Sequence, residues 1–180
     1  MTRRTLLTAA SVLSTTQVRG ANERVNVTLV GLGGRGQDHA RFYSEVATAN
    51  ITGVCDVNQA ARERGVAMVE KLTGRKPKEY SDMRQVFDDK SVDAVSLAIP
   101  NHWHALATIW ACQAGKDVYC EKPASHNIFE GRQMIAAARK YGRMVQVGSQ
   151  SRSIAHKIEG IQFLHQGIIG KVYLAKGLCY

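Results

Sequence analysis

The sequence predicts an α/β domain built on a doubly wound parallel sheet, followed by only the beginning of a second, α+β domain. Apolar runs typical of buried strands alternate with amphipathic stretches typical of helices, and a glycine-rich turn joins the first run to the first helix. The composition agrees, because 44% apolar and 22% charged residues over 180 positions suit a globular domain with a real core. We expect residues 22–150 to form the first domain and 151–180 to begin the second.

Five strands and five helices are expected in alternation. The strand patterns lie at 25–30, 51–55, 93–99, 117–120 and 144–148. The helix patterns lie near 35–48, 58–73, 82–88, 103–114 and 128–141, the third of them short. Gly115 and Gly142 stand where two helices should end in a left-handed residue, and Asn127 with Glu130 resembles a capping box at a helix start. Successive βαβ units with right-handed crossovers follow from this order.

The turn after the first strand carries the pattern of a dinucleotide-binding site. It reads Gly31-Leu32-Gly33-Gly34-Arg35-Gly36 and follows the apolar run 25–30. The first glycine allows a tight turn, the second lets the backbone approach a pyrophosphate, and the last lets the helix pack on the strand. A diphosphate would then lie at a helix N-terminus, where N–H groups and the helix dipole favour negative charge. We therefore expect a Rossmann-type sheet, with the glycines and Arg35 at the cofactor.

Asp56 ends the second apolar run about twenty residues after the turn. A carboxylate there can accept hydrogen bonds from the adenosine ribose hydroxyls and would repel a 2′-phosphate, which favours NAD. Arg35 and Arg62 keep NADP open, because an arginine near the ribose can accept that phosphate. A structural turn beside a solvated aspartate is the alternative interpretation.

Two later loops should border the other half of the cofactor. The strand at 93–99 runs into Pro100-Asn101-His102-Trp103-His104, and the strand at 117–120 runs into Glu121-Lys122-Pro123. In an open α/β sheet, ligands bind at the carboxyl ends of the strands. We therefore expect Pro100 and these loops beside the nicotinamide, whereas Trp103 is interpreted as packing.

These motifs together resemble the Gfo/Idh/MocA family of oxidoreductases. The resemblance rests on the glycine turn, Cys55-Asp56-Val57-Asn58, the Pro-Asn-His-x-His loop, the run 115–123 and Gly148-Ser149-Gln150, and it extends over about 25–180. It implies that Lys122 lies beside the nicotinamide and the substrate hydroxyl, and that Asn101 and His104 lie near the cofactor. The family's large second domain, which shapes the substrate pocket, has no counterpart beyond Tyr180, so we expect a fragment.

Each of these residues also has a structural interpretation. An ammonium at Lys122 can polarise a hydroxyl and relay its proton, and a solvated surface lysine is the alternative. Glu121 is expected to orient Lys122 or contact the cofactor, or else to form a salt bridge. Asn101 and His104 are expected either at the cofactor or as helix caps.

The implied activity is hydride transfer between NAD, or NADP, and a small-molecule sugar or polyol. NAD-dependent glycoside hydrolysis, known in the wider family, is one alternative. A non-catalytic dinucleotide-binding module is another. A homo-oligomer remains open.

Residues 1–21 have the pattern of a twin-arginine export signal. Arg3 and Arg4 precede a mildly apolar stretch that is uncharged until Arg19, and the small residues Gly20 and Ala21 follow. The stretch is too short and too polar to span a bilayer, so no stable membrane insertion is expected after processing. We expect an extracytoplasmic protein, and a disordered basic terminus in a cytoplasmic protein is the alternative.

Charge, histidines and cysteines exclude other classes of site. Loss of the three signal arginines lowers the formal charge from +9 to +6, and the remaining basic residues lack the aromatic interleaving of a single-strand binder, so we expect no nucleic acid. No metal is expected, because His102 and His104 have no third ligand at a helical interval. Cys55, Cys112, Cys120 and Cys179 form no CxxC pair and are expected as buried thiols.

After residue 150 the pattern changes. Apolar positions at 154, 158, 161, 163 and 164 predict a helix, and Lys171–Lys176 predicts a strand that enters the second domain. A single strand would leave an unpaired edge, so this segment should need further chain to complete its sheet.

Overall fold

The computed structural model describes residues 24–178. Its six-stranded sheet has the order β3-β2-β1-β4-β5-β6, which is the order of a doubly wound dinucleotide-binding fold. The strands are β1 (Val25–Val30), β2 (Ala49–Cys55), β3 (Lys78–Tyr80), β4 (Ala94–Leu97), β5 (Asp117–Glu121) and β6 (Val145–Gly148). β1 pairs in parallel with β2 and β4, β2 with β3, and β4 with β5. The predicted fold class is confirmed.

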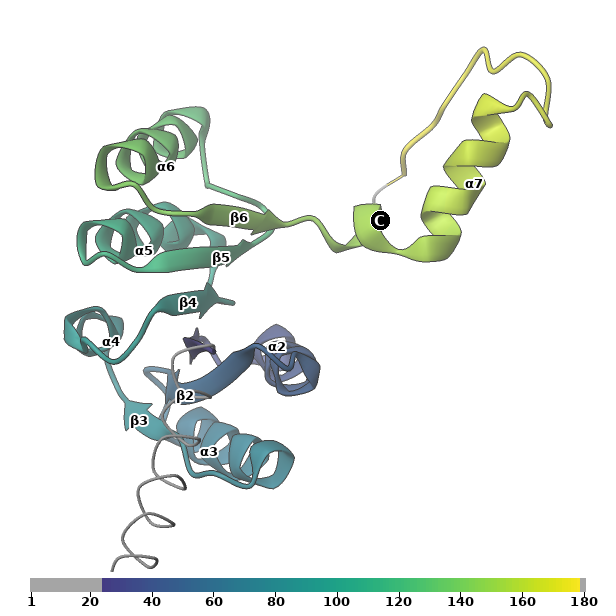
Figure 1. Cartoon of the computed structure of the whole chain (residues 1–180). Helices are drawn as coiled ribbons and strands as arrows, with labels where there is room; N and C mark the ends of the chain where they lie inside the picture. The colour runs from purple at the N-terminus through teal and green to yellow at the C-terminus, as the bar shows by residue number, and fades with distance from the viewer. Residues whose placement is uncertain (1–23, 179–180) are drawn as a thin grey trace, which may run out of the picture. The chain divides into compact units, whose positions relative to one another are not determined.

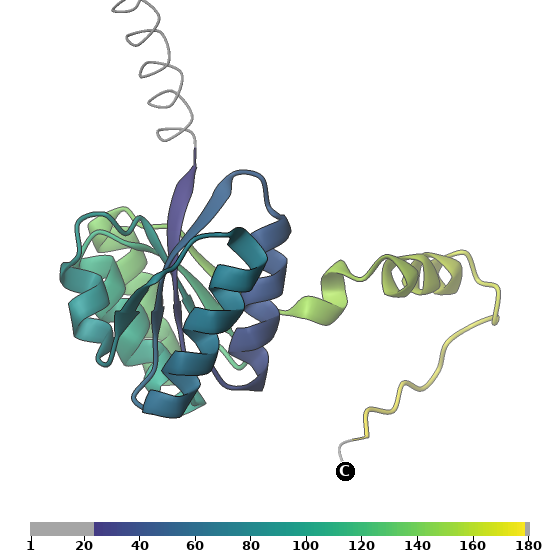
Figure 2. The same cartoon turned by 90° about the horizontal axis from the view of Figure 1, so that it is seen from below.

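Helices cover both faces of this sheet, as Figures 1 and 2 show. α2 (Gly34–Glu45) and α3 (Gln59–Thr73) lie on one face. α4 (Met83–Asp88), α5 (Asn101–Gln113) and α6 (Ile128–Tyr141) lie on the other. A buried cluster fills each interface, one including Leu29, Val54 and Val69 and the other including Leu97 and Ala111. The sheet is therefore buried on both sides, as a parallel sheet requires.

The expected caps are present. Gly115 and Gly142 have φ of 79° and 61°, the left-handed conformation that ends a helix. The Asn127 side chain accepts from the Glu130 N–H at 2.9 Å, and Glu130 Oε2 accepts from the His126 N–H at 3.1 Å. The returning bond reaches the residue before the N-cap, so the motif is a shifted capping box.

One strand was not predicted, and one predicted strand is absent from the described residues. The sequence did not predict β3, because its three residues Lys-Glu-Tyr lack an apolar run and only pairing with β2 makes them a strand. The strand expected at 171–176 is absent, since no regular element follows α7 (Ala155–His165) up to residue 178. A strand needs a neighbour to bond with, and the described part of this segment supplies none.

The chain divides into two compact units between Val147 and Gly148, close to the boundary expected at residue 150. The second unit begins with a short 3-10 helix, η1 (Gln150–Ser153), and continues into α7. The residues of the candidate functional site all belong to the first unit.

The expected signal at 1–21 and Cys179 lie outside the described residues. Cys55, Cys112 and Cys120 are buried free thiols, as expected of core residues. Burial raises the pKa of the Cys55 thiol to about 12. Of the helices between residues 24 and 178, none has the length and apolar character needed to cross a membrane.

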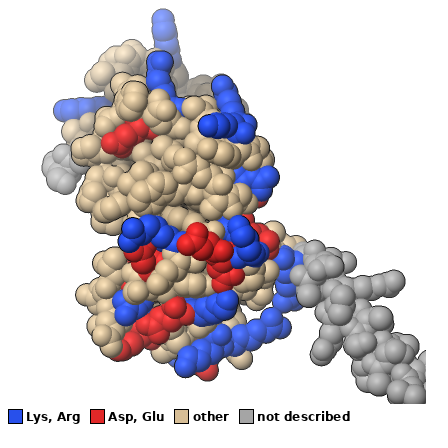
Figure 3. Space-filling view, turned by 90° about the vertical axis from the view of Figure 1, so that its left-hand side faces the viewer, with Lys and Arg blue, Asp and Glu red and all other residues tan. Residues whose placement is uncertain are grey.

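Charged side chains of both signs share the face that carries α4, α5 and α6 (Figure 3). Blue and red groups alternate over the lower half of this view, and most of the upper half is uncharged. Arg62–Glu79 at 2.8 Å and Lys78–Asp89 at 2.7 Å are ion pairs of β3 with neighbouring elements. The basic excess therefore forms no single-sign stripe on this face. The absence of a nucleic-acid partner stays a prediction.

Candidate functional site

A pocket of about 580 Å³ opens at the carboxyl ends of β1, β2 and β4. Four of the expected cofactor residues line it, namely Gly31, Gly33, Asp56 and Pro100. The other lining residues are Val30, Cys55, Val57, Asp82, Met83, Arg84, Ala98, Ile99, Trp103 and Trp110. The reversal of strand order between β1 and β4 places this pocket where doubly wound sheets bind their ligands.

The residues Gly31–Gly36, called the glycine turn below, are fixed by close backbone contacts. Gly31 has φ of 87°, and a Cβ there would lie 2.4 Å from the Ala98 carbonyl oxygen. A Cβ on Gly36 would lie 1.9 Å from the Gly31 carbonyl oxygen. Only glycine fits either position, because both contacts are with backbone that cannot rotate away.

The N-terminus of α2 is open toward the ligand side. Its N-cap is Gly33, which supplies no side-chain hydrogen bond, whereas Asn58, Asp82 and Asn127 cap α3, α4 and α6. A Cβ at Gly33 or Gly34 would meet nothing within 4 Å. The start of α2 thus has open space beside Gly33 and Gly34 and no side-chain cap from its N-cap residue, an arrangement that fits the pyrophosphate of a dinucleotide.

Asp56 joins the end of β2 to the glycine turn. Its Oδ2 accepts from the Leu32 N–H at 2.8 Å, and its Oδ1 accepts from the Asn58 N–H at 2.9 Å. These bonds fix the carboxylate, and each oxygen keeps a further lone pair for a hydroxyl donor. The site can therefore bind a ribose through Asp56.

Arg62, which kept NADP open, is already engaged. Its guanidinium donates to Glu79 at 2.8 Å and to the carbonyl oxygens of Asp56 and Val57. Arg62 thus stabilises the backbone of the loop that follows β2.

Sequence reasoning missed one wall of the pocket. Asp82 and Arg84 form an ion pair beside Met83, and Asp82 also accepts from the Arg84 N–H at 2.9 Å to cap α4. The sequence predicted a short helix at 82–88, which covers these residues, but it gave no sign that the start of this helix borders the pocket. Trp103, interpreted as packing, lines the pocket and is 40% exposed.

Glu121 lies at the centre of a second, buried group of polar side chains. Its Oε1 accepts from Arg35 Nε at 2.7 Å and faces His39 Nε2 at 3.0 Å. Burial alone would raise the pKa of Glu121, but the hydrogen bonds from Arg35 and His39 outweigh it and lower the pKa to about 2. Glu121 is therefore a carboxylate at neutral pH. The salt-bridge interpretation of Glu121 agrees with these contacts.

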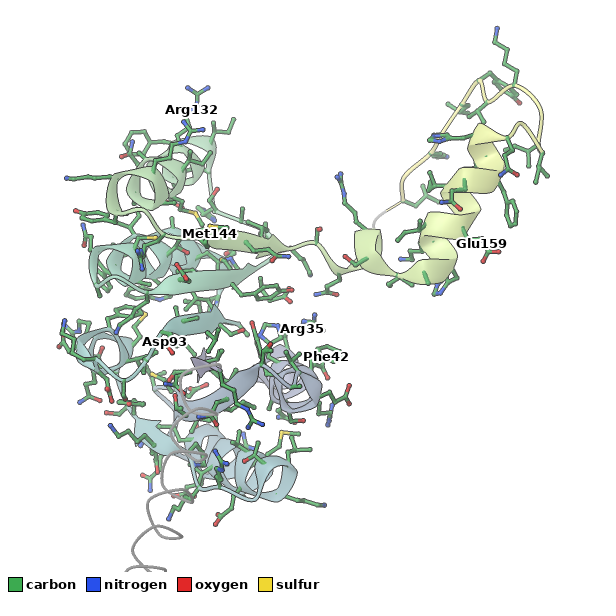
Figure 4. The ribbon with its side chains drawn as sticks, viewed as in Figure 1. Arg35, Phe42, Asp93, Arg132, Met144 and Glu159 are labelled. Atoms are coloured by element: carbon green, nitrogen blue, oxygen red, sulfur yellow. The ribbon has the colours of Figure 1, made fainter. Side chains whose placement is uncertain are left out.

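Arg35 reaches Glu121 from the first turn of α2. Figure 4 shows Arg35 and Phe42 on this helix, and the guanidinium carbon lies 5.7 Å from the centre of the Phe42 ring. A weak ion pair with Asp38 at 3.4 Å completes its contacts with charged groups. Arg35 and Gly34 lie at the start of α2, outside the lining of the pocket.

The residues Glu121–Pro123, called the lysine corner below, follow β5. Lys122 is exposed, and among residues 24–178 its ammonium has no hydrogen-bond or ion-pair partner. Its backbone N–H donates to Glu121 Oε2 at 3.2 Å, and its peptide bond to Pro123 is cis. Lys122 and Glu121 do not line the pocket. An exposed ammonium at a strand end is available to a substrate oxygen.

His104 and Asn101 lie outside the lining of the pocket, and their place at the cofactor stays a prediction. His104 is 1% exposed, with Nδ1 2.6 Å from the Pro123 carbonyl oxygen and Nε2 2.9 Å from the Ile99 carbonyl oxygen. These two contacts connect the loop after β4 with the loop after β5, and His104 does not line the pocket. Asn101 is the first residue of α5, after the N-cap Pro100, and also lies outside the lining. Helix geometry, which the sequence pattern cannot resolve to one face, sets both outcomes.

No group of three or more His, Cys, Asp and Glu side chains that could hold a metal ion occurs between residues 24 and 178. The polar chemistry of the described site is therefore that of backbone N–H groups, carboxylates and the Lys122 ammonium.

Comparisons with known proteins agree with this geometry. The model of the GFO_IDH_MocA family, described as an oxidoreductase family with an NAD-binding Rossmann fold, matches residues 25–149. Inositol 2-dehydrogenase of Salmonella paratyphi B is 30% identical over 154 residues, which are 84% of this chain and 45% of that protein. A crystal structure of an NAD binding oxidoreductase from Klebsiella pneumoniae matches with a TM-score of 0.65 and 32% identity, covering 81% of this chain and 39% of that one.

A more distant relative carries another activity in its name. Glycosyl hydrolase family 109 protein 1 of Shewanella sp. is 23% identical over 83% of this chain and 34% of its own length. The chain spans less than half the length of these curated relatives.

Proposed function

Since this chain belongs to the Gfo/Idh/MocA oxidoreductase family, we propose that it is the cofactor-binding part of an enzyme that transfers a hydride between NAD and a small polyol or sugar. The chain is an NAD-binding Rossmann domain of that family. The reaction and the substrate class are the proposal, supported by relatives that are named as inositol dehydrogenases.

One observation carries the proposal. The glycine turn, the Asp56 carboxylate and Pro100 meet around one pocket at the carboxyl edge of the sheet. The turn offers uncapped N–H groups to a diphosphate, and Asp56 offers lone pairs to a ribose. Together they hold the adenosine and pyrophosphate portions of a dinucleotide.

Lys122 is the residue we propose for the chemistry. When bound, the nicotinamide ring accepts or returns a hydride. In the reduction direction the Lys122 ammonium would give a proton to the substrate carbonyl oxygen, and in the oxidation direction the neutral Lys122 amine would accept the proton that the substrate hydroxyl loses. Its exposure at the end of β5, without a partner among residues 24–178, leaves the ammonium free for this role.

We propose NAD rather than NADP as the cofactor. Asp56 would repel a 2′-phosphate, Arg62 is held by Glu79 and two carbonyl oxygens, and Arg84 is paired with Asp82. No cation at this edge of the pocket is thus left unpaired within the described chain.

Calorimetric titration of the 180-residue chain with NAD and with NADP tests the proposal. We expect NAD to bind more tightly, and Asp56→Asn to lower the NAD affinity about tenfold while leaving NADP unchanged or tighter. Glu70→Gln, which removes an exposed carboxylate from α3, is the matched control. An unchanged preference in Asp56→Asn would contradict the role of Asp56, and no binding of either dinucleotide would contradict the proposal itself.

NAD-dependent glycoside hydrolysis is the second candidate, favoured by the Shewanella relative. The two candidates differ in net redox change. We expect the full-length protein to reduce NAD with a polyol such as inositol, in proportion to product. Release of sugar from a nitrophenyl glycoside without accumulation of NADH would support the hydrolase instead.

We also propose that residues 1–21 direct export by the twin-arginine route. The sequence support is the pair Arg3 and Arg4 ahead of an uncharged stretch. In a bacterial host we expect an extracytoplasmic protein whose mass has lost the first 20 or so residues. Changing Arg3 and Arg4 to Lys should retain the unprocessed protein in the cytoplasm, and equal export of both forms would contradict the proposal.

A further inference from the structure

Three buried polar side chains form a line of hydrogen bonds under the lysine corner. Ser96 Oγ lies 2.9 Å from His39 Nδ1, and His39 Nε2 lies 3.0 Å from Glu121 Oε1. Ser96, His39 and Glu121 are 1%, 3% and 4% exposed. The line comes from three elements, β4, α2 and β5, and ends at the Lys122 N–H, which donates to Glu121 Oε2.

The chemistry of the groups fixes the direction of these bonds. An ionised carboxylate only accepts, so His39 Nε2 carries the proton that it donates to Glu121. Nδ1 of the neutral ring then accepts from the Ser96 hydroxyl. Burial lowers the pKa of His39, which agrees with a neutral ring at pH 7.

A serine, a histidine and a carboxylate in this order also occur in hydrolytic triads. That activity does not fit here, because Ser96 lies on a central strand under α2 and no substrate can reach a hydroxyl that is 1% exposed. A structural or positioning role is what the burial allows.

Arg35 connects the same carboxylate to the glycine turn. Arg35 and His39 are four residues apart on α2, so both project from one face of the helix and both contact Glu121 Oε1. One carboxylate group therefore bonds to the first turn of the phosphate-binding helix and to the backbone of Lys122.

We propose that His39 is a positioning residue for Lys122, acting through Glu121. By holding Oε1, it keeps Oε2 on the Lys122 N–H and couples ligand binding at the glycine turn to the placement of the Lys122 backbone. This inference rests on the function proposed above for Lys122. His39 itself contacts neither cofactor nor substrate.

Two amide variants separate the hydrogen bond from packing. In His39→Gln, the amide nitrogen lies about as far along the side chain as Nε2 of the histidine, so it can still donate to Glu121. In His39→Asn, the amide nitrogen reaches only as far as Nδ1, so the hydrogen bond to Glu121 is lost. Ser44→Ala is the matched control, because it changes a side chain of the same helix whose hydroxyl donates to the Arg41 carbonyl oxygen at 2.6 Å.

The first measurement is amide hydrogen exchange at Lys122 in the ligand-free chain. We expect His39→Asn to speed exchange at this amide about tenfold, and His39→Gln and Ser44→Ala to stay within about threefold of the original chain. Exchange in the β1 and β4 strand centres serves as the measure of general destabilisation. A Lys122 rate that is equal in the Asn and Gln variants would overturn the proposal.

The second measurement is NAD affinity by calorimetry. We expect an affinity loss of about tenfold in His39→Asn and rescue in His39→Gln. If the original chain binds no NAD, the proposed function fails, and exchange at Lys122 still decides the positioning role.

Should His39→Asn not fold, Ser96→Ala replaces it. Ser96→Ala removes the hydroxyl that orients the His39 ring, so we expect the Lys122 amide to exchange about threefold faster. An unchanged exchange rate at Lys122 in this variant would overturn the proposal.

Discussion

The two ends of the candidate site are built in different ways. The glycine turn is shaped by backbone contacts within a short stretch of chain, since Gly36 packs against the carbonyl of Gly31. The lysine corner is shaped by side chains from distant segments, since Glu121 bonds to Arg35 and His39, which lie more than 80 residues earlier. The first end depends on an absence of side-chain atoms, and the second on their presence.

The two ends of the site should therefore differ in how well they tolerate substitutions. A backbone contact cannot adjust, so an added methyl group should disrupt the turn at once. A network of hydrogen bonds can lose one member and partly keep its geometry, because Glu121 has several donors. We therefore expect sharp losses at the turn and graded losses at the corner.

Gly36→Ala should have the largest effect. Its Cβ would lie 1.9 Å from the Gly31 carbonyl oxygen, so α2 must move away from β1. We expect the free energy of unfolding to fall by about 3 kcal/mol and the NAD affinity to fall about 100-fold. Urea denaturation and calorimetry measure the two effects.

Gly34→Ala is the control for that change. A Cβ at Gly34 meets nothing within 4 Å, so the free energy of unfolding should stay within about 1 kcal/mol of the original or rise. The NAD affinity should still fall, because the methyl group enters the space in front of the helix. Equal destabilisation by both substitutions would contradict the backbone account of the turn.

Glu121→Gln should have the second largest effect. The change keeps the shape of the side chain but replaces the acceptor of Arg35 and His39 with a neutral amide. We expect the free energy of unfolding to fall by about 1–2 kcal/mol, less than for a fully buried pair because the Arg35 side chain is 31% exposed.

A double-mutant cycle sharpens this test. Combining Glu121→Gln with His39→Asn should cost about 1 kcal/mol less than the sum of the single changes, since each change removes the hydrogen bond that the two groups share. Strict additivity of the two changes would show that His39 and Glu121 do not interact in solution.

The same contrast explains what the sequence could and could not predict. The turn, β1 and Asp56 are local patterns, and the structure places Gly31, Gly33 and Asp56 at the pocket. His39 carries no local signal, because only the strand order brings α2 over β5. Local signals predict local geometry, and the long-range partners of Glu121 follow only from the assembled sheet.

The surroundings of His104 and the state of residues 171–176 also depend on the assembled fold. His104 lies close in sequence to Pro100, but its place on α5 points it beneath the loops, where both nitrogens meet carbonyl oxygens. The segment 171–176 has the apolar content of a strand but no neighbouring strand in the described chain. A helix face and a strand partner are both properties of the whole fold.

A smaller effect should appear in the pH dependence of stability, to which the corner contributes two steps. The folded pKa of His39 lies below its ordinary value because of burial, so the unfolded chain binds more protons as the pH falls below about 6.5. The free energy of unfolding should therefore fall between pH 7 and pH 5. Below about pH 4.3 it should fall again, because the folded pKa of Glu121 is about 2.

His39→Gln tests the origin of the upper step. Gln does not titrate, so urea denaturation of this variant should show a flatter dependence between pH 7 and pH 5 and an unchanged loss below pH 4.3. Gly34→Ala should keep both steps, since Arg35, the ionisable residue of the turn, stays charged throughout this pH range. A His39→Gln profile that matches the original chain would assign the upper step to another residue.

Lys122→Met should have the smallest effect on stability, and it separates the corner's scaffold from the group that the scaffold presents. The Lys122 side chain is exposed and makes no hydrogen bond or ion pair within residues 24–178, so the free energy of unfolding should change by no more than about 0.5 kcal/mol. The Lys122 N–H would still donate to Glu121, because the backbone is unchanged.

In the full-length protein, the same substitution should nevertheless lower kcat for polyol oxidation by about 100-fold or more, since a thioether cannot polarise the hydroxyl. Retention of kcat in Lys122→Met would move the proton-transfer role to a residue outside this chain, while a large loss of stability would place Lys122 in the scaffold with Glu121.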